Sequence, residues 1–428
     1  MNISEIYKLF LQCGEVTTDS RNCPEGSMFI ALKGESFNGN LFAGKALESG
    51  CRYAVVDEAE YVKGDNYILV EDTMTTLQQL ANYHRRKLKT KIIGITGTNG
   101  KTTTKELVSA VLMQKYNVLF TQGNFNNHIG VPLTLLRLTK KHDLAVVEMG
   151  ANHPGEISTL VNIAEPDYGI ITNVGMAHLE GFGSLEGVIR TKGELYDYLR
   201  TKHNAVVFVQ NENEHLNNIV HGLQTVRYGQ HKGLAVSGEL ISCSPFLHFS
   251  WTADSSTYIV CTNLIGAYNL DNALAAVAVG LYMDVEPAQI CRALKSYEPT
   301  NNRSQLKDTG VNKLIIDAYN ANPTSMMAAL RNFRLMGAER KMVILGDMKE
   351  LGESSRDEHV KIVEYLKQCN FGRVILIGPE FKSVGSDYEV YDDASQVKEM
   401  LCGEKPKEYY ILVKGSNSMK LSSLVEYL

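Results

Sequence analysis

The 428-residue sequence has few features that would tie it to a membrane or a nucleic acid. It contains no long apolar run of the kind that spans a bilayer and no segment typical of a secretion signal. Lys and Arg number 43 and Asp and Glu number 48, so the net charge is only −5. This balance argues against nucleic-acid or membrane partners, and any anionic ligand must be held by local sites.

Closely spaced cysteines are also missing. The eight cysteines form no close pair and show none of the spacings typical of zinc sites. Together with the missing signal segment, this pattern favours cysteines that act as small hydrophobic residues in a reducing cytoplasm over a disulfide framework. There is no internal repeat or low-complexity segment, and 44% hydrophobic and 21% charged residues are typical of a globular protein.

The chain is too long for one hydrophobic core, and apolar runs alternate with helical patterns, which predicts three α/β domains. We expect a small α/β domain at 1–88, a central domain with a mostly parallel sheet at 89–298, and a doubly wound, Rossmann-like domain at 299–428. Central strands are expected at 91–95, 118–121, 144–149, 168–174 and 205–209, with an antiparallel extension near 258–261. Residues 297–303 are interpreted as a linker, and the basic run 84–87 as a solvated helix end.

The stretch 91–107 carries the strongest functional signal. Its β-branched residues at 92–95 predict a buried strand, and periodic apolar residues after position 101 predict a helix. Between them, residues 97–100 form a turn without a large side chain, and Lys101 follows. A helix N-terminus with free N–H groups and a lysine attracts anions, so we expect this loop to bind phosphate. It is a variant, because Ile95 stands where the usual phosphate loop has its first glycine.

Two oxygen ligands for Mg²⁺ are predicted close to this loop. Thr102 supplies a hydroxyl, as in other phosphate loops. Glu148 ends a predicted parallel strand, and ligands bind at the carboxyl ends of the strands in open α/β sheets. A carboxylate there can reach Mg²⁺ on nucleotide phosphates directly or through water.

Other polar residues allow two interpretations each. The run 122–128, with three asparagines and a histidine, either holds substrate carboxylates or hydroxyls or forms an asparagine-rich turn. From residue type alone, His178 fits a structural histidine better than a magnesium ligand, since Mg²⁺ prefers oxygen. Lys192, on a predicted helix, fits a surface lysine.

Several motifs in order resemble the Mur ligases, which build the peptide of bacterial cell-wall precursors. Residues 96–103 are similar to the ATP loop of that family, and residues 18–34 to its UDP-sugar-binding domain. Matches at 122–132, 147–152, 177–183, 317–323, 345–352 and 413–416 resemble the subfamily that adds D-Ala-D-Ala. The Asp-Asn-Pro-Arg motif of relatives that add meso-diaminopimelate is absent.

The resemblance implies a cytoplasmic, monomeric ligase that uses ATP and two Mg²⁺ ions. It would join D-Ala-D-Ala to UDP-N-acetylmuramoyl-tripeptide through an acyl phosphate. It also changes two interpretations: His178 becomes a metal ligand beside Glu148, and Lys192 matches a lysine that the family carbamylates with CO₂. A carbamate would turn this cation into an oxygen ligand for the second Mg²⁺.

The residue patterns and the resemblance together give four groups of candidate residues. The catalytic group is Lys101, His178, Lys192 and Arg303. The ATP-binding group is Gly97, Thr98, Asn99, Gly100, Lys101, Thr102, Thr103, Asn269, Asn272, Arg303, Asp317 and Asn320. The substrate-binding group is Ser20, Arg21, Lys33, Gly34, Asn124, Asn126, Asn127, His128, Asn173 and Asn322. The metal-binding group is Thr102, Glu148, His178 and Lys192 as its carbamate.

Two positions depart from the family pattern, and three alternatives stay open. Asn302 stands where a glycine often precedes the linker arginine, and residues 37–40 replace a commoner Asp-Gly-His pattern. A folylpolyglutamate synthetase-like ligase is the first alternative, although such enzymes lack the UDP-binding domain suggested by residues 18–34. The second is a nucleotide-gated binding module without ligase chemistry. A simple P-loop kinase is third, and it leaves the last domain unexplained.

Overall fold

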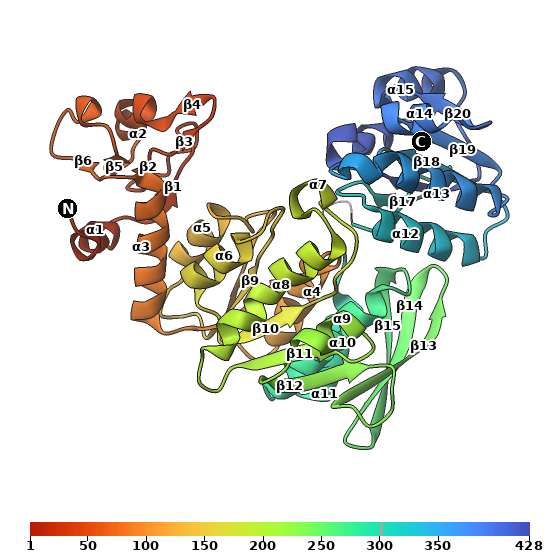
Figure 1. Cartoon of the computed structure of the whole chain (residues 1–428), viewed down its shortest axis with the longest axis horizontal. Coiled ribbons are helices and arrows are strands. Elements are labelled where there is room, and N and C mark those ends of the chain that lie inside the picture. The colour runs from red at the N-terminus through yellow and green to blue at the C-terminus, as the bar shows by residue number, and fades with distance from the viewer. Residues whose placement is uncertain (300–302) are drawn as a thin grey trace.

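The computed structural model describes residues 1–299 and 303–428, so Asn302 and the middle of the predicted linker lie outside the described residues. Three main sheets of four, nine and six strands organise the chain. Figure 1 shows the N-terminal and C-terminal units at opposite ends, with the nine-stranded sheet between and below them. Within these described ranges, no helix combines the length and apolar character needed to cross a bilayer.

The N-terminal unit contains α1 (Ile3–Phe10), β1 (Val16–Thr17), β2 (Met28–Ile30), β3 (Lys33–Gly34), β4 (Phe37–Asn38), η1 (Gly39–Phe42), α2 (Ala43–Glu48), β5 (Tyr53–Val56), η2 (Ala59–Tyr61), β6 (Tyr67–Leu69) and α3 (Thr73–Leu88). Its parallel sheet has the order β1-β2-β5-β6. Side chains alternate across it, so Met28 and Val55 pack towards α1 and α3, whereas Phe29 and Ala54 pack towards α2.

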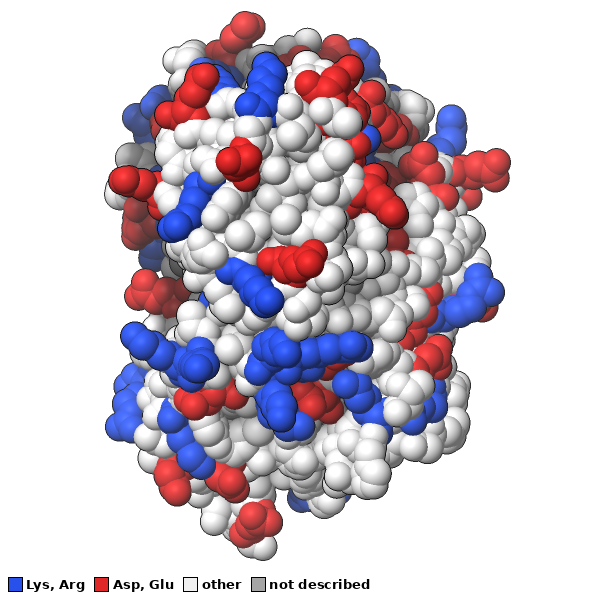
Figure 2. Space-filling view, turned by 90° about the vertical axis from the view of Figure 1, so that its left-hand side faces the viewer, with Lys and Arg blue, Asp and Glu red and all other residues white. Residues whose placement is uncertain are grey.

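The last turn of α3 is basic, and only Arg86 and Lys87 form the solvated helix end expected from the sequence. His84 and Arg85 are only 5% and 7% exposed. His84 Nε2 lies 2.9 Å from the carbonyl oxygen of Leu138, and Arg85 and Arg86 pair with Glu165. Figure 2 shows Lys and Arg gathered in a band on this side of the molecule, with acidic side chains among them. The run therefore joins the first unit to the second.

The central unit contains β7 (Lys91–Thr96), α4 (Lys101–Leu112), β8 (Val118–Phe120), α5 (Gly130–Leu136), β9 (Leu144–Glu148), α6 (Glu156–Ala164), β10 (Tyr168–Ile171), α7 (Leu179–Phe182), α8 (Leu185–Arg200), β11 (Val206–Gln210), α9 (Glu214–Ile219), β12 (Gln224–Gly229), β13 (Val236–Cys243), β14 (Phe246–Ala253), β15 (Ser256–Ile265), α10 (Asn269–Tyr282) and α11 (Pro287–Ser296). Its strand order is β15-β14-β13-β12-β11-β10-β7-β9-β8. Pairing is parallel from β8 to β13 and antiparallel from β13 to β15, which is the predicted extension.

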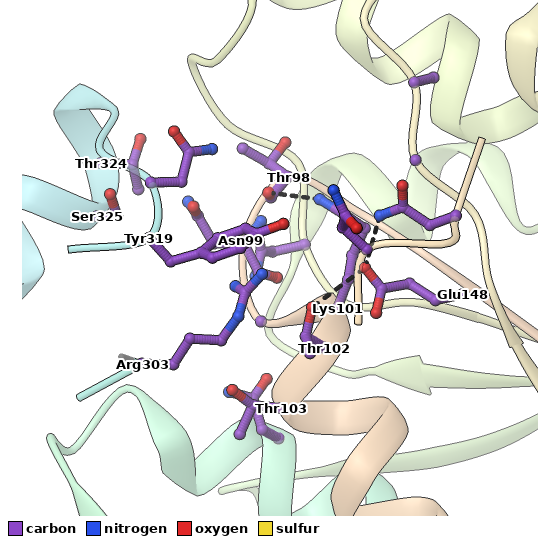
Figure 3. A pocket seen from close by; sticks show the side chains of 18 of the residues that line it. Thr98, Asn99, Lys101, Thr102, Thr103, Glu148, Arg303, Tyr319, Thr324 and Ser325 are labelled. Carbon is purple, nitrogen blue, oxygen red and sulfur yellow. Dashed lines mark hydrogen bonds between the residues drawn. The ribbon is translucent and has the colours of Figure 1, made fainter. Parts of the chain in front are cut away.

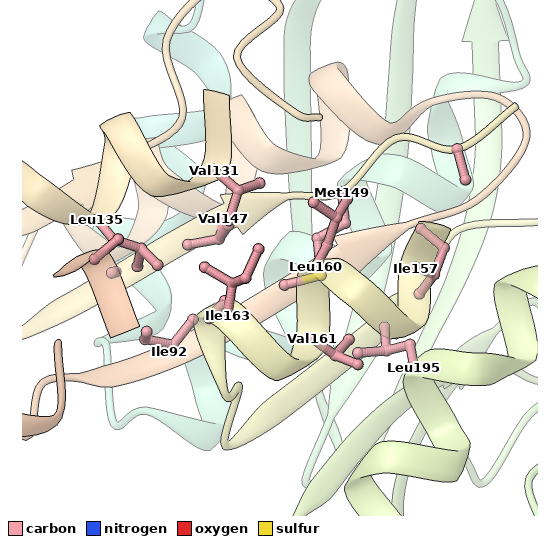
Figure 4. Close-up of a cluster of buried hydrophobic side chains, with 14 of the residues drawn as sticks. Ile92, Val131, Leu135, Val147, Met149, Ile157, Leu160, Val161, Ile163 and Leu195 are labelled. Atoms are coloured by element: carbon pink, nitrogen blue, oxygen red, sulfur yellow. The ribbon is translucent and has the colours of Figure 1, made fainter. Parts of the chain in front are cut away.

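Helices cover both faces of this sheet because its buried strands alternate their apolar side chains. Ile92 and Val147 belong to the cluster that includes α5, α6 and α8 (Figure 4), whereas Ile93 and Val146 belong to the cluster that includes α4 and α10. Strands β7 and β9 are neighbours, with Ile95 paired to Glu148. This register brings Glu148 next to the start of the phosphate loop.

The C-terminal unit contains β16 (Gln305–Asp308), β17 (Lys313–Asp317), α12 (Pro323–Leu335), β18 (Lys341–Gly346), η3 (Gly352–Ser354), α13 (Ser355–Lys367), β19 (Arg373–Ile377), α14 (Pro379–Val384), β20 (Glu389–Tyr391), α15 (Ala394–Gly403), β21 (Tyr410–Lys414), η4 (Asn417–Met419) and η5 (Leu421–Leu424). Its order is β16-β17-β21-β18-β19-β20, with only β16 antiparallel within the described residues. Helices flank both faces. The predicted three-part α/β fold with a doubly wound last unit is confirmed.

Hydrophobic clusters run across the borders of these units. Ile265, at the end of β15, is 1% exposed and lies in the same cluster as Phe333 of α12. Leu77 and Leu80 of α3 lie in the same cluster as Val131 of α5. The antiparallel extension therefore supports the C-terminal unit, and α3 supports the N-terminal one.

Candidate active site

A cavity of about 790 Å³ lies between the central and C-terminal units. Its walls come from the phosphate loop, the ends of β8, β9 and β10, the start of α10, and residues that precede α12 (Figure 3). Gln78 of α3 also lines it. The predicted residues that line it are Thr98, Asn99, Gly100, Lys101, Thr102, Thr103, Asn124, Asn126, Asn127, His128, Glu148, Asn173, His178, Asn269, Asn272, Arg303, Asp317 and Asn320.

Two glycines allow the phosphate loop to pass close to its neighbours. Gly97 has φ of 139°, and a Cβ there would lie 2.0 Å from Thr172 Oγ1. Gly100 has φ of 78°, and a Cβ there would lie 2.5 Å from Asn272 Oδ1. Any larger residue at either position would clash and adopt a strained backbone, so the chain needs glycine at both.

Asparagines from two other segments hold the loop at Asn99. Asn173 Oδ1 accepts from the Asn99 backbone N–H at 3.0 Å, and Asn173 Nδ2 donates to the Asn99 carbonyl at 3.0 Å. From the C-terminal unit, Asn322 Nδ2 donates to Asn99 Oδ1 at 2.8 Å. Asn322 also caps α12 by accepting from the Ser325 N–H at 2.8 Å. Thus Asn322, predicted to bind substrate, contacts the loop and does not itself line the cavity.

Lys101 lies at the cavity with its ammonium turned along the loop. Its Nζ donates to the carbonyl oxygens of Gly97 at 2.9 Å and Thr98 at 3.1 Å. The pKa of Lys101 is lowered to about 8, mainly by burial; the charge of Glu148 opposes this shift and the charge of Arg303 adds to it. With this pKa, Lys101 is mostly protonated at pH 7 and contributes a positive charge to the cavity.

Glu148 provides a carboxylate oxygen suited to a cation. Its Oε1 accepts from Thr102 Oγ1 at 3.1 Å and from Asn126 Nδ2 at 2.8 Å. Its Oε2 is buried and has no hydrogen-bond partner among the residues the structure describes. A buried, unpartnered carboxylate oxygen is costly unless a ligand satisfies it. The described residues hold no group of three His, Cys, Asp or Glu that suits a metal, but Mg²⁺ commonly takes one or two carboxylates plus phosphates and water.

Lys192 is not the surface lysine that its residue type suggested. The residue is 2% exposed, and its Nζ donates to the carbonyl oxygen of Ala151, which lines the cavity, at 3.2 Å. Burial, together with the charge of Lys101, lowers the pKa of Lys192 well below its ordinary value. Its Nζ lies 5.2 Å from the ring centroid of Phe182. The imidazole of His178 lies 6.2 Å from the same centroid, so Lys192 and His178 both pack on one aromatic ring.

The start of α10 is tied to α4 by paired asparagines. Asn272 Nδ2 donates to Asn269 Oδ1 at 2.8 Å, and Thr104 Oγ1 donates to Asn272 Oδ1 at 3.0 Å. Both asparagines line the cavity beside the phosphate loop. This places them on the same wall as Thr103, where a nucleotide base could follow its phosphates.

Aromatic and charged groups from the C-terminal unit face this wall. The Arg303 guanidinium lies 4.0 Å from the ring centroid of Tyr319, an arrangement that Figure 3 shows. Lys414 is only 1% exposed. Its Nζ donates to Asp317 Oδ2 at 2.6 Å and to the carbonyl oxygen of Asn320. The cavity therefore gathers the cations Lys101 and Arg303, which suit a triphosphate, whereas the charge of Lys414 is paired with Asp317.

The structure does not bring all predicted residues to this cavity. Ser20, Arg21, Lys33 and Gly34 belong to the N-terminal unit and do not line it, nor do Gly97, Lys192 and Asn322. Arg21 pairs with Asp19, and Lys33 Nζ lies 3.2 Å from Asp57 Oδ1. In the asparagine-rich run, Asn127 Oδ1 accepts from two backbone N–H groups, as a turn requires, although Asn127 also lines the cavity.

Sequence reasoning missed several cavity residues, among them Gln78, Glu156, Tyr268, Tyr297, Tyr319, Thr324, Ser325 and Lys414. Tyr319 and Lys414 fall inside motifs already singled out, so their positions at strand ends could have identified them. Tyr297 and Gln78 carry no local signal, because their places depend on how distant elements pack.

Comparison with known proteins identifies the class of enzyme. Residues 95–280 match the Mur ligase middle domain, residues 302–417 match the domain described as Mur ligase, glutamate ligase domain, and residues 13–87 match the Mur ligase family, catalytic domain. The chain therefore belongs to the Mur ligase family.

Individual relatives within the family carry the name of one particular enzyme. UDP-N-acetylmuramoyl-tripeptide–D-alanyl-D-alanine ligase of Bacillus subtilis is 36% identical over 96% of this chain and 92% of its own length. The enzyme of that name from Escherichia coli is 33% identical over 96% of this chain and 93% of its own length. MurF from Acinetobacter baumannii has a TM-score of 0.89 at 29% identity, covering 99% of this chain and 98% of its own.

Two further structures bear on the ligand and on the first alternative. MurF ligase of Thermotoga maritima, solved in complex with ADP, has a TM-score of 0.86 at 27% identity over 98% of this chain and 97% of its own. A folylpolyglutamate synthase of the same organism has a TM-score of only 0.59 at 15% identity, over 82% of this chain and 93% of its own length. That enzyme shares the fold and is a more distant relation.

Proposed function

We propose that this protein is an ATP-dependent ligase that joins the amine of D-Ala-D-Ala to the terminal carboxylate of UDP-N-acetylmuramoyl-tripeptide, releasing ADP and phosphate. The reaction supplies a precursor of peptidoglycan. The observation that supports it most is the cavity in which a phosphate loop, Lys101 and Arg303 face the C-terminal unit. Relatives at 33–36% identity over nearly the whole chain carry the corresponding name.

The chemistry explains why a triphosphate site and a peptide site share one cavity. A carboxylate is a poor acceptor for an amine, because its leaving group would be oxide. Transfer of the γ-phosphoryl group of ATP to that carboxylate gives an acyl phosphate, and the dipeptide amine then attacks the acyl carbon. The tetrahedral intermediate expels phosphate and leaves an amide. Phosphoryl transfer needs mostly positioning and neutralisation of charge.

The chain supplies both requirements. Backbone N–H groups at the start of α4 and the Lys101 ammonium bind and orient phosphate oxygens. Arg303, stacked on Tyr319, brings a second cation from the other side of the cavity. Asn269 and Asn272 lie where they can bind the adenine, and Asp317 and Asn320 face the nucleotide from the C-terminal unit. Asn124, Asn126 and Asn127 line the same cavity and would bind the peptide, and Asn173 joins them from its place against the phosphate loop at Asn99.

The donor set fits Mg²⁺. The unpartnered Oε2 of Glu148 and the hydroxyl of Thr102 would hold one ion. His178 and a carbamate on Lys192, both packed on Phe182, would hold a second. When bound, Mg²⁺ neutralises the charge that develops on the phosphates. The carbamate itself is supported by the burial of Lys192, which lowers its pKa and so favours the neutral amine, the form that reacts with CO₂.

The remaining parts of the proposal concern the whole chain. The unit at 1–88 would hold the UDP end of the substrate through Ser20, Arg21, Lys33 and Gly34, whereas residues 89–298 and 299–428 would carry out the chemistry. The enzyme would act as a monomer in the cytoplasm. All eight cysteines are free thiols.

The decisive experiment is a phosphate-release assay against a panel of UDP-muramoyl peptides. Phosphate release is expected only when ATP, Mg²⁺, the tripeptide substrate and D-Ala-D-Ala are all present, and EDTA is expected to abolish it. Mass spectrometry of the product would show the added dipeptide. ATP hydrolysis without the dipeptide would instead favour a nucleotide-gated binding module.

Asn322 offers a sharper test of how the C-terminal unit meets the nucleotide loop. Both Asn322→Asp and Asn322→Ser keep a good cap for α12 but remove the amide donor to Asn99; Asp has no donor in its place, and Ser has only a hydroxyl on a shorter side chain. Asp also places a carboxylate beside the Asn99 oxygen and the triphosphate. We expect the KM for ATP to rise about tenfold in Asn322→Asp and less in Asn322→Ser, with little change in Tm, since a lost hydrogen bond to the loop costs roughly 1–3 kcal/mol. An unchanged KM in both variants would contradict this role.

A further inference from the structure

One contact between the central and C-terminal units has no role in the mechanism described above. His178 Nδ1 pairs with the carboxylate of Glu350, which lies in the loop between β18 and η3. The two residues are 172 positions apart in the sequence. The His178 side chain is 20% exposed and that of Glu350 is 51% exposed; His178 lines the cavity and Glu350 does not.

The surrounding backbone fixes both partners. His178 has φ of 52° and Glu350 has φ of 64°, left-handed conformations that residues other than glycine rarely adopt. Beside them, the Glu180 N–H donates to the Glu350 carbonyl at 3.4 Å. On the other side of the imidazole, the Phe182 ring stands edge-on at 6.2 Å. Strained backbone at both ends of one contact points to a functional arrangement.

The chemistry of the pair decides which ring nitrogen is free. An ionised carboxylate only accepts hydrogen bonds, so Nδ1 carries the proton and donates it to Glu350. A neutral imidazole in that tautomer keeps its lone pair on Nε2. Nε2 has no hydrogen-bond partner among residues 1–299 and 303–428. A carboxylate that orients a histidine from behind is the arrangement that metal sites commonly use.

We propose that Glu350 is a positioning residue that holds His178 in the Nδ1–H tautomer, with Nε2 turned to receive a divalent cation. The metal ligand His178 and its orienting carboxylate, Glu350, then come from different units. The C-terminal unit must therefore be docked on the central unit for the site to reach its full affinity for the cation. This inference rests on the proposed role of His178 as a metal ligand.

The test is a titration of the full-length protein with Mn²⁺, followed by electron paramagnetic resonance, in bicarbonate buffer with a non-hydrolysable ATP analogue. We expect Glu350→Ala to weaken Mn²⁺ binding about 10–100-fold, the usual effect of removing such a partner. Glu350→Gln keeps an acceptor without the charge and should lie between this variant and the wild type. Glu353→Gln removes an exposed acid from the same segment and should bind Mn²⁺ like the wild type.

A double-variant cycle shows whether Glu350 works through His178. Loss of Glu350 should have no further effect on Mn²⁺ binding once His178 is alanine, and Tm should be similar in all variants. Equal losses from Glu350→Ala in both backgrounds, or unchanged or tighter binding in the single variant, would overturn the proposal. If His178→Ala itself leaves Mn²⁺ binding unchanged, the metal role of His178 fails first, which separates the two hypotheses.

Discussion

Replacing Lys101 with methionine is expected to reduce ligase turnover by about 10²–10³-fold or more while the fold remains intact. Methionine keeps the apolar stem of lysine but removes the only formal charge within the phosphate loop, residues 97–102. Phosphoryl transfer concentrates negative charge on oxygens that this ammonium is placed to meet. Because Arg303 approaches from the C-terminal unit, it cannot replace a charge at the start of α4.

The measurement is kcat with saturating dipeptide and tripeptide, together with the affinity for an ATP analogue and Tm. Lys115→Met, beyond the other end of α4, removes the same charge from the same segment and should keep wild-type activity. Lys101→Arg tests geometry, since its planar head does not match the position of an ammonium. Substantial turnover in Lys101→Met would count against the assignment of the loop.

Replacing Lys192 with methionine is expected to reduce turnover by about 10²–10³-fold, as for loss of one strong electrostatic group. The unprotonated amine attacks CO₂, forms an N–C bond and releases a proton, so the buried lysine becomes a carboxylate-like ligand. Burial favours this reaction because it lowers the pKa of Lys192 and so favours the unprotonated amine. In wild-type protein, removal of CO₂ from the buffer should lower activity and added bicarbonate should restore it.

The carbamate can be observed directly. Protein equilibrated with ¹³C-bicarbonate should show one carbamate carbonyl resonance that is missing in Lys192→Met. Lys202→Met, just past the end of α8, serves as the control and should keep both the resonance and the activity. Full activity of the wild type without CO₂, with no resonance, would show that Lys192 acts as an amine.

Much of the fold could be predicted because its strands are short, β-branched and bounded by polar turns. The central strand β7 and the C-terminal strand β19 are apolar over nearly their whole length, and they form where the sequence indicates. β12 and β16 were not predicted. β12, Gln-Thr-Val-Arg-Tyr-Gly, and β16, Gln-Leu-Lys-Asp, are too polar to stand out and owe their strand conformation to neighbouring strands.

The candidate site shows the same division between local and distant causes. The phosphate loop is a local feature, so strand, turn and helix could be located together. Burial of Lys192 also had a local signal, since Val188, Lys192, Leu195 and Leu199 share the buried face of α8. Asn322, followed by Pro323 at the first position of α12, carried the signature of a helix cap. The pairing of His178 with Glu350 depends on how two units dock, and no local pattern predicts it.

The clusters that cross the unit borders have a consequence for any attempt to dissect the protein. Excising the C-terminal part at the linker would leave Ile265 without the aromatic and aliphatic neighbours that now cover it. Removing the first part together with α3 would likewise uncover Val131. Fragments cut at those borders would expose new apolar patches and tend to aggregate, so we expect the three units to be stable together and not as separate modules.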